Sequence, residues 1–274
     1  MKIIYTGILI LIVAISAGFL SCQAQTSTQS KDLEVDKQTS RQVVSSANPM
    51  SVEYLMGKFD QKIHPDFTEI PLKYADRPDL YLRKDVYDAF VEMYNSALQE
   101  GIRIQIRSAT RNFEDQKRIW ENKWTGKTIL EDNINAATEY KDELSRAKKI
   151  LEYSSMPGTS RHHWGTDMDI NSFTNDWFDE GPGLKLYTWM INNAHKFGFC
   201  QPYTKMGSDR NSGYFEEKWH WSYMPVSQNL TKMVKEKMKN EMISGFMGSD
   251  TAEKIDMLKN YILGISPTCL TTKD

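Results

Sequence analysis

The 274-residue sequence contains five histidines, and two of them stand beside other residue types that bind metals. His162 lies in the segment SRHHWGTDMDI, which also contains Asp169, and His220 lies in the segment EEKWHWSY. Imidazole nitrogens and carboxylate oxygens bind zinc well, and a catalytic zinc usually has three protein ligands and one open position. His162, Asp169 and His220 are therefore candidate ligands of one zinc ion per chain.

Glu217 precedes His220 by three residues and is a candidate catalytic base. A carboxylate beside a zinc site can take a proton from an attacking water and pass it to the leaving amine of a peptide. Zinc itself assists by lowering the pKa of water to about 7. The adjacent Glu216 competes with Glu217 for this role.

Hydrophobic spacing predicts the elements that must position these side chains. Residues 84–99 carry apolar side chains at helical spacing and end before Gly101, where a helix-ending glycine is common. Residues 102–107 alternate isoleucine with polar residues, as a half-buried strand does. Further helices are expected to begin at Asn112 and to span residues 136–153, 184–197, 226–243 and 251–263, with strands over residues 165–170 and 219–223.

This order of elements predicts the fold class. His162 would come from a loop, and Asp169 and His220 from two strands, so that ligands from separate elements converge. Helices interleaved with strands, and a site carried on a loop, favour an α+β fold over a doubly wound sheet. We expect a small central antiparallel sheet with flanking helices, a single zinc site in a cleft, and C-terminal helices.

Composition excludes two broad classes of protein. Hydrophobic residues make up 40% and charged residues 26% of the chain, which is ordinary for a globular protein with a core. The formal net charge is -2, so there is no basic excess for general binding to nucleic acid or to a membrane surface. The 13 tyrosines and 7 tryptophans suit the walls of a cleft, and they suit a core equally well.

The N-terminus predicts export. Residues 1–22 join a positive start to an apolar run and small residues, which is typical of a secretory signal peptide; a retained membrane anchor is the alternative. Residues 19–22 resemble a relaxed lipobox, in which Cys22 would carry lipid. The polar residues 23–50 predict a disordered tether. We expect a periplasmic or cell-envelope protein whose membrane contact is confined to this end.

The other two cysteines, Cys200 and Cys269, leave two readings open. An exported compartment would permit a disulfide between them. Two separate buried thiols are favoured, because pairing cannot be read from spacing alone.

Three motifs carry a resemblance to a known family. The pattern Ser-x-His-x-x-Gly-x-x-x-Asp is matched by Ser160, His162, Gly165 and Asp169, and the pattern Glu-x-Trp-His by Glu217, Trp219 and His220. Residues 108–116 are similar to a Ser-x-x-Arg-Ser-x-x-x-Gln segment. Together these resemble the VanY-type D-Ala-D-Ala carboxypeptidases. That zinc peptidase group includes D-Ala-D-Ala dipeptidases and shares its fold with the Hedgehog signalling domain. The resemblance covers residues 81–223.

The resemblance implies a role for each matching residue. His162, Asp169 and His220 would be the zinc ligands, which favours His162 over the adjacent His163, and Glu217 rather than Glu216 would be the base. Arg111 would lie near the scissile carbonyl or a substrate carboxylate, where its charge offsets that of the oxyanion. Substrate-binding residues would be Ser160, Gln116 and Ser108.

Two departures from the family pattern are Asp167 and Asn112, where the family commonly has alanine and serine. On a strand, Asp167 points the same way as Asp169. A hydrogen bond from a ligand histidine to Asp167 is the preferred reading, with an alternative ligand or a substrate contact as the others. Trp219 is likewise expected beside the ligands without binding the metal.

The implied function is hydrolysis of peptidoglycan stem peptides, with zinc as cofactor and no nucleic-acid partner. The leading hypothesis is a D-Ala-D-Ala carboxypeptidase formed by residues 51–225, followed by a C-terminal helical appendage of residues 226–274. The alternatives are an L,D-carboxypeptidase, a dipeptidase or an endopeptidase of the same group, and a non-catalytic metal-stabilised binding module. The candidate base beside an open metal site argues against the last.

Overall fold

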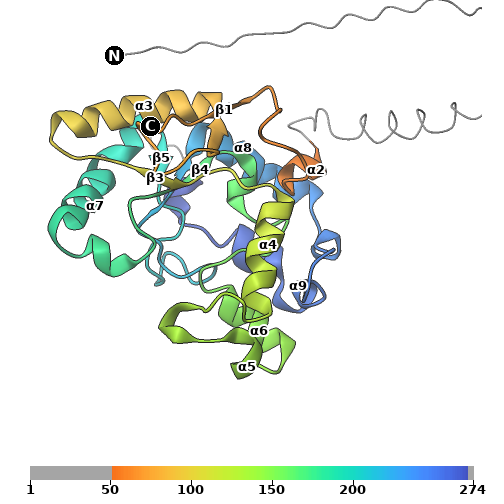
Figure 1. Cartoon of the computed structure of the whole chain (residues 1–274). Coiled ribbons are helices and arrows are strands. Elements are labelled where there is room, and N and C mark those ends of the chain that lie inside the picture. The colour runs from red at the N-terminus through yellow and green to blue at the C-terminus, as the bar shows by residue number, and fades with distance from the viewer. Residues whose placement is uncertain (1–50, 271–274) are drawn as a thin grey trace, which may run out of the picture. The chain divides into compact units, whose positions relative to one another are not determined.

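A four-stranded antiparallel sheet organises the fold, in the order β3-β4-β6-β5. Helices surround the sheet (Figure 1). The strands are β3 (Ile106–Ser108), β4 (Asp167–Ile170), β6 (His220–Tyr223) and β5 (Phe199–Cys200). A separate antiparallel pair joins β1 (Phe67–Glu69) to β2 (Tyr81–Arg83). With helices around these small sheets, the α+β class and the antiparallel sheet predicted from the sequence are confirmed.

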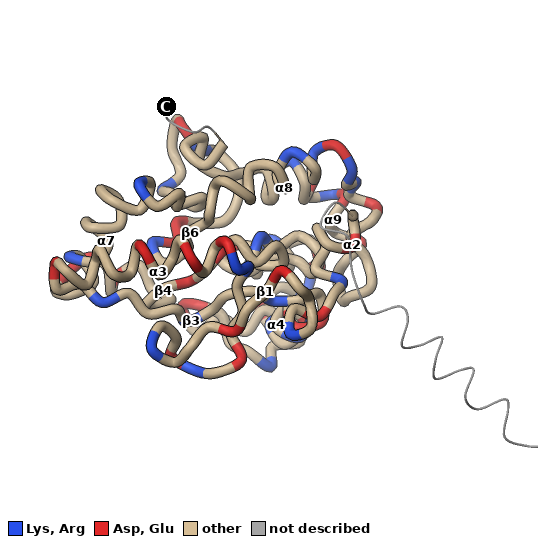
Figure 2. The backbone as a smooth tube through the Cα atoms, turned by 90° about the horizontal axis from the view of Figure 1, so that it is seen from above, with Lys and Arg blue, Asp and Glu red and all other residues tan. Residues whose placement is uncertain are grey.

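The computed structural model describes residues 51–270. The expected signal peptide of residues 1–22, with Cys22, and the expected tether of residues 23–50 lie outside the described residues. Across residues 51–270, no helix has both the length and the apolar character that crossing a membrane requires. Both basic and acidic residues are scattered along the backbone, in keeping with the small net charge (Figure 2).

The first hydrophobic core lies between the sheet and two long helices, α3 (Lys84–Gln99) and α7 (Gly181–Asn193). The bounds of α3 are those predicted from its apolar spacing. Both helices contribute fully buried side chains that pack with the inward-facing residues of β3, β4 and β6. The central members are Val86, Phe90, Met93, Ile106, Met168, Ile170, Leu186, Met190 and Trp221.

A second core joins α4 (Phe113–Trp124) and α6 (Glu143–Ile150) to the C-terminal residues that include α9 (Thr251–Ile255), as Figure 1 shows. Trp120 is fully buried here, and its indole N–H donates to the carbonyl oxygen of Met247 at 2.9 Å. The C-terminal residues therefore complete the core that supports α4.

The remaining elements are short, apart from one helix that follows β6. They are α2 (Val52–Leu55), α5 (Ala136–Glu139), α8 (Met224–Lys237), the 3-10 turns η1 (Glu131–Asn133), η2 (Arg161–Trp164), η3 (Asn175–Phe178), η4 (Ala194–Phe197), η5 (Asn240–Met242) and η7 (Pro267–Cys269), and the π-helical turn η6 (Leu258–Ile262).

The strand predicted over residues 102–107 is wrong for residues 102–105, since β3 begins at Ile106. Ile106 pairs with Ile170, the last residue of β4. The next residue, Asn171, has a φ of 57° and leaves the strand. The segment before Ile106 therefore has no partner strand. Gln105 instead exchanges hydrogen bonds with Asn171, accepting from its backbone N–H and donating to its side chain.

Three predicted helices are shorter or interrupted. The helix expected over residues 136–153 is broken, because Asp142 caps a new helix by accepting from the N–H of Ser145 at 2.8 Å. The helix expected over residues 251–263 is broken at Asp256, which has a φ of 54°. The helix expected over residues 226–243 is α8, which ends at Lys237.

Cys200 and Cys269 form a disulfide, with their Cα atoms 5.6 Å apart. The reading of two separate thiols is therefore wrong. The bond ties the last described turn, η7, to the edge strand β5. The two cysteines are 69 positions apart in the sequence, so their contact could not be read from it.

Candidate metal centre

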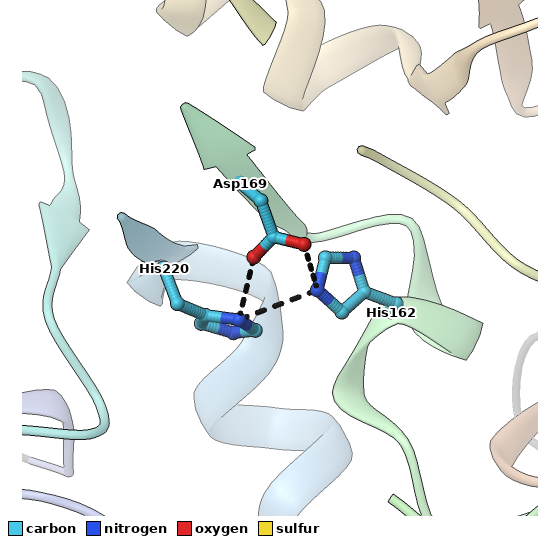
Figure 3. A group of neighbouring side chains, drawn as sticks. All are labelled: His162, Asp169 and His220. Atoms are coloured by element: carbon cyan, nitrogen blue, oxygen red, sulfur yellow. Dashed lines mark hydrogen bonds and ion pairs between the residues drawn. The ribbon is translucent and has the colours of Figure 1, made fainter. Parts of the chain in front are cut away.

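His162, Asp169 and His220 meet at one point, on η2, β4 and β6 respectively (Figure 3). His162 Nε2 lies 3.3 Å from Asp169 Oδ2 and 3.3 Å from His220 Nδ1, and His220 Nδ1 lies 3.0 Å from Asp169 Oδ1. All three side chains are buried. Two imidazole nitrogens and a carboxylate thus converge in a space that can hold a metal ion.

The outer nitrogen of each imidazole is held by an acceptor. His162 Nδ1 donates to the carbonyl oxygen of Ala109 at 2.8 Å, and His220 Nε2 donates to Asp167 Oδ2 at 2.9 Å. In each neutral ring the proton is therefore on the outer nitrogen, and a lone pair is directed inward. Three electron-pair donors face one another, an arrangement that is stable only around a cation.

The pKa of His220 also indicates that positive charge is favoured between the three side chains. Burial disfavours its charged form, but hydrogen bonds to Asp167 and Asp169 raise the pKa of His220 to about 9. Positive charge is therefore favoured between His220 Nδ1 and Asp169, and a bound divalent metal ion would supply it. The donor set of two nitrogens and one carboxylate fits zinc.

Local structure explains how the three candidate ligands are brought together. Ser160 caps η2 by accepting from the N–H of His162 at 3.3 Å. Gly165, with a φ of 72°, ends η2 and turns the chain into β4. Pairing of β4 with β6 then places Asp169 directly opposite His220.

Asp167 lies beneath His220 in a fully buried ion pair with Arg161. Arg161 Nε donates to Asp167 Oδ2 at 3.0 Å, and its other nitrogens donate to the hydroxyls of Ser222 and Thr231. Burial alone would raise the pKa of Asp167, but Arg161 and His220 hold it well below its usual range. The carboxylate stays ionised and fixes the imidazole of His220.

His163, the alternative to His162, has both nitrogens engaged by backbone. Its Nδ1 lies 2.6 Å from the carbonyl oxygen of Arg111, and its Nε2 accepts from the N–H of Gly158 at 3.0 Å. Burial lowers its pKa to about 3, so the ring stays neutral. These hydrogen bonds of His163 hold the loop that carries His162, and they leave no ring nitrogen of His163 for a metal.

Glu217 is buried beside the three ligands, with Oε2 3.4 Å from His220 Nδ1. Burial, reinforced by Asp169, raises its pKa to about 8 against the opposing effect of three nearby cationic groups. Glu217 lines the cleft that opens from the ligands, and Glu216 is not among the residues of its lining. The structure thus brings Glu217, and not Glu216, to the metal-facing atoms.

Arg111 reaches the same place from the start of α4, with Nη1 3.5 Å from Asp169 Oδ2. Its guanidinium also donates to the hydroxyl of Ser108 and, at 2.9 Å, to Gln116 Oε1. Gln116 is itself anchored, because its Nε2 donates to the carbonyl oxygen of Ser155 at 2.8 Å. Ser108 and Gln116, predicted to bind substrate, are therefore also the residues that orient Arg111.

Ser160 and Trp219 also line the cleft. The Ser160 hydroxyl serves as the cap of η2. The ring of Trp219 packs near that of Tyr153, with centroids 6.2 Å apart, and its carbonyl oxygen accepts from the N–H of Ile170. These contacts of Trp219 involve the cleft wall and the sheet.

The cleft has a volume of about 710 Å³, in the range of small-molecule sites. Besides the predicted residues, its lining includes Lys123, Tyr153, Tyr203 and Tyr214, which the sequence motifs did not mark. The ring of Tyr203 lies 4.7 Å from that of His220, centroid to centroid. In the sequence, only the abundance of tyrosine indicated that Tyr153, Tyr203 and Tyr214 could form the walls of a cleft.

Comparisons with known proteins identify related sequences. The model of the family described as VanY, D-alanyl-D-alanine carboxypeptidase, matches residues 79–226. A putative carboxypeptidase of Bacillus subtilis, YodJ, is 29% identical over 158 residues, which are 57% of this chain and 50% of the relative. A D-alanyl-D-alanine carboxypeptidase of Enterococcus faecalis is 24% identical over 208 residues, 74% of this chain and 65% of the relative. The chain thus matches between half and two thirds of these relatives' length.

Two solved structures are similar at lower identity. The vancomycin-resistance D,D-pentapeptidase VanY in complex with Zn(II) has a TM-score of 0.47 at 20% identity, covering 76% of this chain and 96% of that one. The LD-carboxypeptidase LdcB has a TM-score of 0.47 at 23% identity, covering 77% and 89%.

Proposed function

The chain belongs to the VanY family of D-alanyl-D-alanine carboxypeptidases, and we propose that it is a zinc enzyme that removes the terminal D-alanine from peptidoglycan stem peptides. The observation that carries the proposal is the convergence of His162, Asp169 and His220, with one ligand atom of each directed to the same point and Glu217 beside them. When bound there, zinc would polarise the scissile carbonyl and acidify water.

Glu217 is the general base of the proposed reaction. Its carboxylate is within 3.4 Å of a metal-facing nitrogen and shares the cleft with the substrate. It would accept the proton of the attacking water and return that proton to the leaving amine. A buried carboxyl whose pKa is raised toward neutral pH is suited to both transfers.

Arg111 stabilises the negative charge that develops on the carbonyl oxygen. Its guanidinium is held near Asp169 by Ser108 and Gln116, so little reorganisation is needed as the charge forms. This favours Arg111 as a partner of the oxyanion rather than of a distant substrate group.

Export to the periplasm or cell envelope is part of the proposal. The substrate class is extracellular, and the disulfide between Cys200 and Cys269 supports an oxidising compartment. Residues 1–22, with Cys22, would direct the export.

The test combines metal content with hydrolysis. We expect about one zinc per chain and chelator-sensitive release of D-alanine from a muropeptide pentapeptide. Glu217→Gln should retain zinc and lower kcat by roughly 10²- to 10⁴-fold, the usual range for a general base. Glu216→Gln is the matched control and should keep full activity.

Other outcomes would indicate a different activity or refute the mechanism. Cleavage of a tetrapeptide but not of the pentapeptide would indicate an L,D-carboxypeptidase, and cleavage within a cross-linked dimer would indicate an endopeptidase. Zinc binding without hydrolysis of any of these would leave a metal-stabilised binding module. Absence of bound metal, or full activity in Glu217→Gln, would refute the proposed mechanism.

A further inference from the structure

Lys123 is a cation in the cleft that the proposed reaction does not use. It lies on α4, seven residues after Gln116, so both side chains lie on the same face of the helix. Both line the cleft, together with Arg111 and Glu217. Lys123 therefore has access to whatever occupies the space next to the catalytic groups.

The other basic residues of the cleft are already neutralised by carboxylates. The pairs are Lys62 with Asp79 at 3.2 Å, Arg77 with Asp76 at 3.1 Å, Arg118 with Asp115 at 3.0 Å and Arg111 with Asp169 at 3.5 Å. Within residues 51–270, no carboxylate lies within 4.0 Å of Lys123 Nζ, and its hydrogen-bond partner is the neutral hydroxyl of Ser154 at 2.6 Å. An ammonium has three N–H donors, so two remain for a ligand.

This arrangement leaves Lys123 short of negative charge. Burial lowers its pKa from the ordinary value, and Glu131 and Glu217 oppose that effect only from beyond ion-pair distance. Holding a partly buried cation without a direct counter-charge costs free energy. A bound anion would supply the missing counter-charge.

We propose that Lys123 forms an anion subsite that receives a carboxylate of the peptide substrate. The inference rests on the proposed function, since it assigns part of the substrate to the cleft of that enzyme. A stem peptide offers a carboxylate at its C-terminus and others on its side chains, and both would be recognised by the same ammonium. In the proposed reaction Arg111 serves the oxyanion, with Ser108 and Gln116 holding its guanidinium beside Asp169. Lys123 is then the cation of the cleft that remains for a carboxylate.

The experiment measures binding, so that it does not depend on turnover. In zinc-loaded Glu217→Gln protein, titration calorimetry compares D-alanyl-D-alanine with its C-terminal amide, and a stem pentapeptide with the same peptide amidated only on its side-chain carboxylates. For the ligand whose carboxylate Lys123 holds, adding Lys123→Met should weaken binding roughly 10- to 100-fold, as for a hydrogen bond to a charged group. The matching amide should bind the two proteins equally. Lys123→Arg should retain most of the affinity.

The ligand pairs identify the source of the carboxylate. Selective loss with D-alanyl-D-alanine assigns Lys123 to the terminal carboxylate, and selective loss only with the pentapeptide assigns it to a side chain. Equal loss for free and amidated forms of both ligands overturns the proposal. In protein that keeps Lys123, equal binding of free and amidated forms of both ligands also overturns it, without any substitution at that position.

Two controls separate this inference from its premises. Ser154→Ala removes the internal hydrogen bond of Lys123 but keeps its charge, so it should preserve the preference for the free carboxylate. Failure of the unsubstituted enzyme to release D-alanine would remove the proposed function, whereas the binding preference would still report on Lys123.

Discussion

Asp167 serves two positively charged neighbours at once, Arg161 and the ring of His220. Its place next to a ligand histidine could be predicted, because Asp167 and Asp169 lie two residues apart on one strand. Arg161 could not, because nothing in a sequence distinguishes an arginine that will be buried from one on the surface. The nitrogens of His163 were equally ambiguous until Gly158 and Arg111 were seen to engage them.

Replacing Asp167 with asparagine should affect metal binding and folding together. The free energy of unfolding should fall by about 3–5 kcal/mol, because Arg161 would be left buried without its counter-charge. Metal affinity should fall roughly 10- to 100-fold, because the amide fixes the His220 ring less well. Urea unfolding and competition with a chelator measure the two effects. Asp88→Asn, on the exposed face of α3, is the control and should change neither. Unchanged metal affinity in folded Asp167→Asn would show that the carboxylate serves Arg161 alone.

At the scale of elements, what depends on nearby residues was predicted better than what depends on strand pairing. The helix α3 follows from the spacing of its own residues, and so does the cap of α4 by Asn112, whose side chain accepts from the N–H of Asp115 at 2.9 Å. The extent of β3 depends instead on Asn171, 65 residues later than Ile106 in the sequence, which ends the partner strand. A strand needs a neighbour, and local alternation cannot say where that neighbour stops.

Gly165 connects η2 to β4, and replacing it with any residue that has a side chain should destabilise the protein. A Cβ there would lie 2.3 Å from Phe67 Cε1, and the φ of 72° is unfavourable for alanine. Strain and overpacking together should lower the free energy of unfolding by roughly 2–5 kcal/mol. Metal affinity should fall as well, because Gly165 sets the spacing of His162 and Asp169. Gly101→Ala isolates the strain, since Gly101 has a φ of 74° and nothing within 4 Å of an added Cβ. Equal losses in the two variants would contradict the role of packing at Gly165.

At the scale of the whole molecule, the C-terminal residues belong to the structure that supports the cleft. They complete the core behind α4, which carries Gln116 and Lys123 into the cleft. The sequence predicted helices there but not the elements that they pack against. Amphipathic spacing shows that one face of a helix is buried, but it does not identify the element that covers that face. The disulfide was misjudged for the same reason: Cys200 and Cys269 are brought together only by the fold.

Removing the disulfide should destabilise the protein without abolishing the site. The bond closes a loop with a sequence separation of 69, for which chain entropy gives about 4 kcal/mol and typical measured losses are about 2–5 kcal/mol. Cys269→Ser should therefore unfold at lower urea concentration, and a reductant should bring the unsubstituted protein to the same midpoint while leaving the variant unaffected. Equal stability of the variant and the oxidised protein would show that packing alone holds the C-terminal end.

The pairing of β4 with β6 has a consequence for quality control during folding. Asp169 faces His220 in one register only, because a slip of one residue turns every side chain of a strand to the opposite face. A misregistered sheet would therefore not bring the three candidate ligands together. If the site binds zinc as proposed, the ion would add stability only to chains whose central strands have aligned correctly.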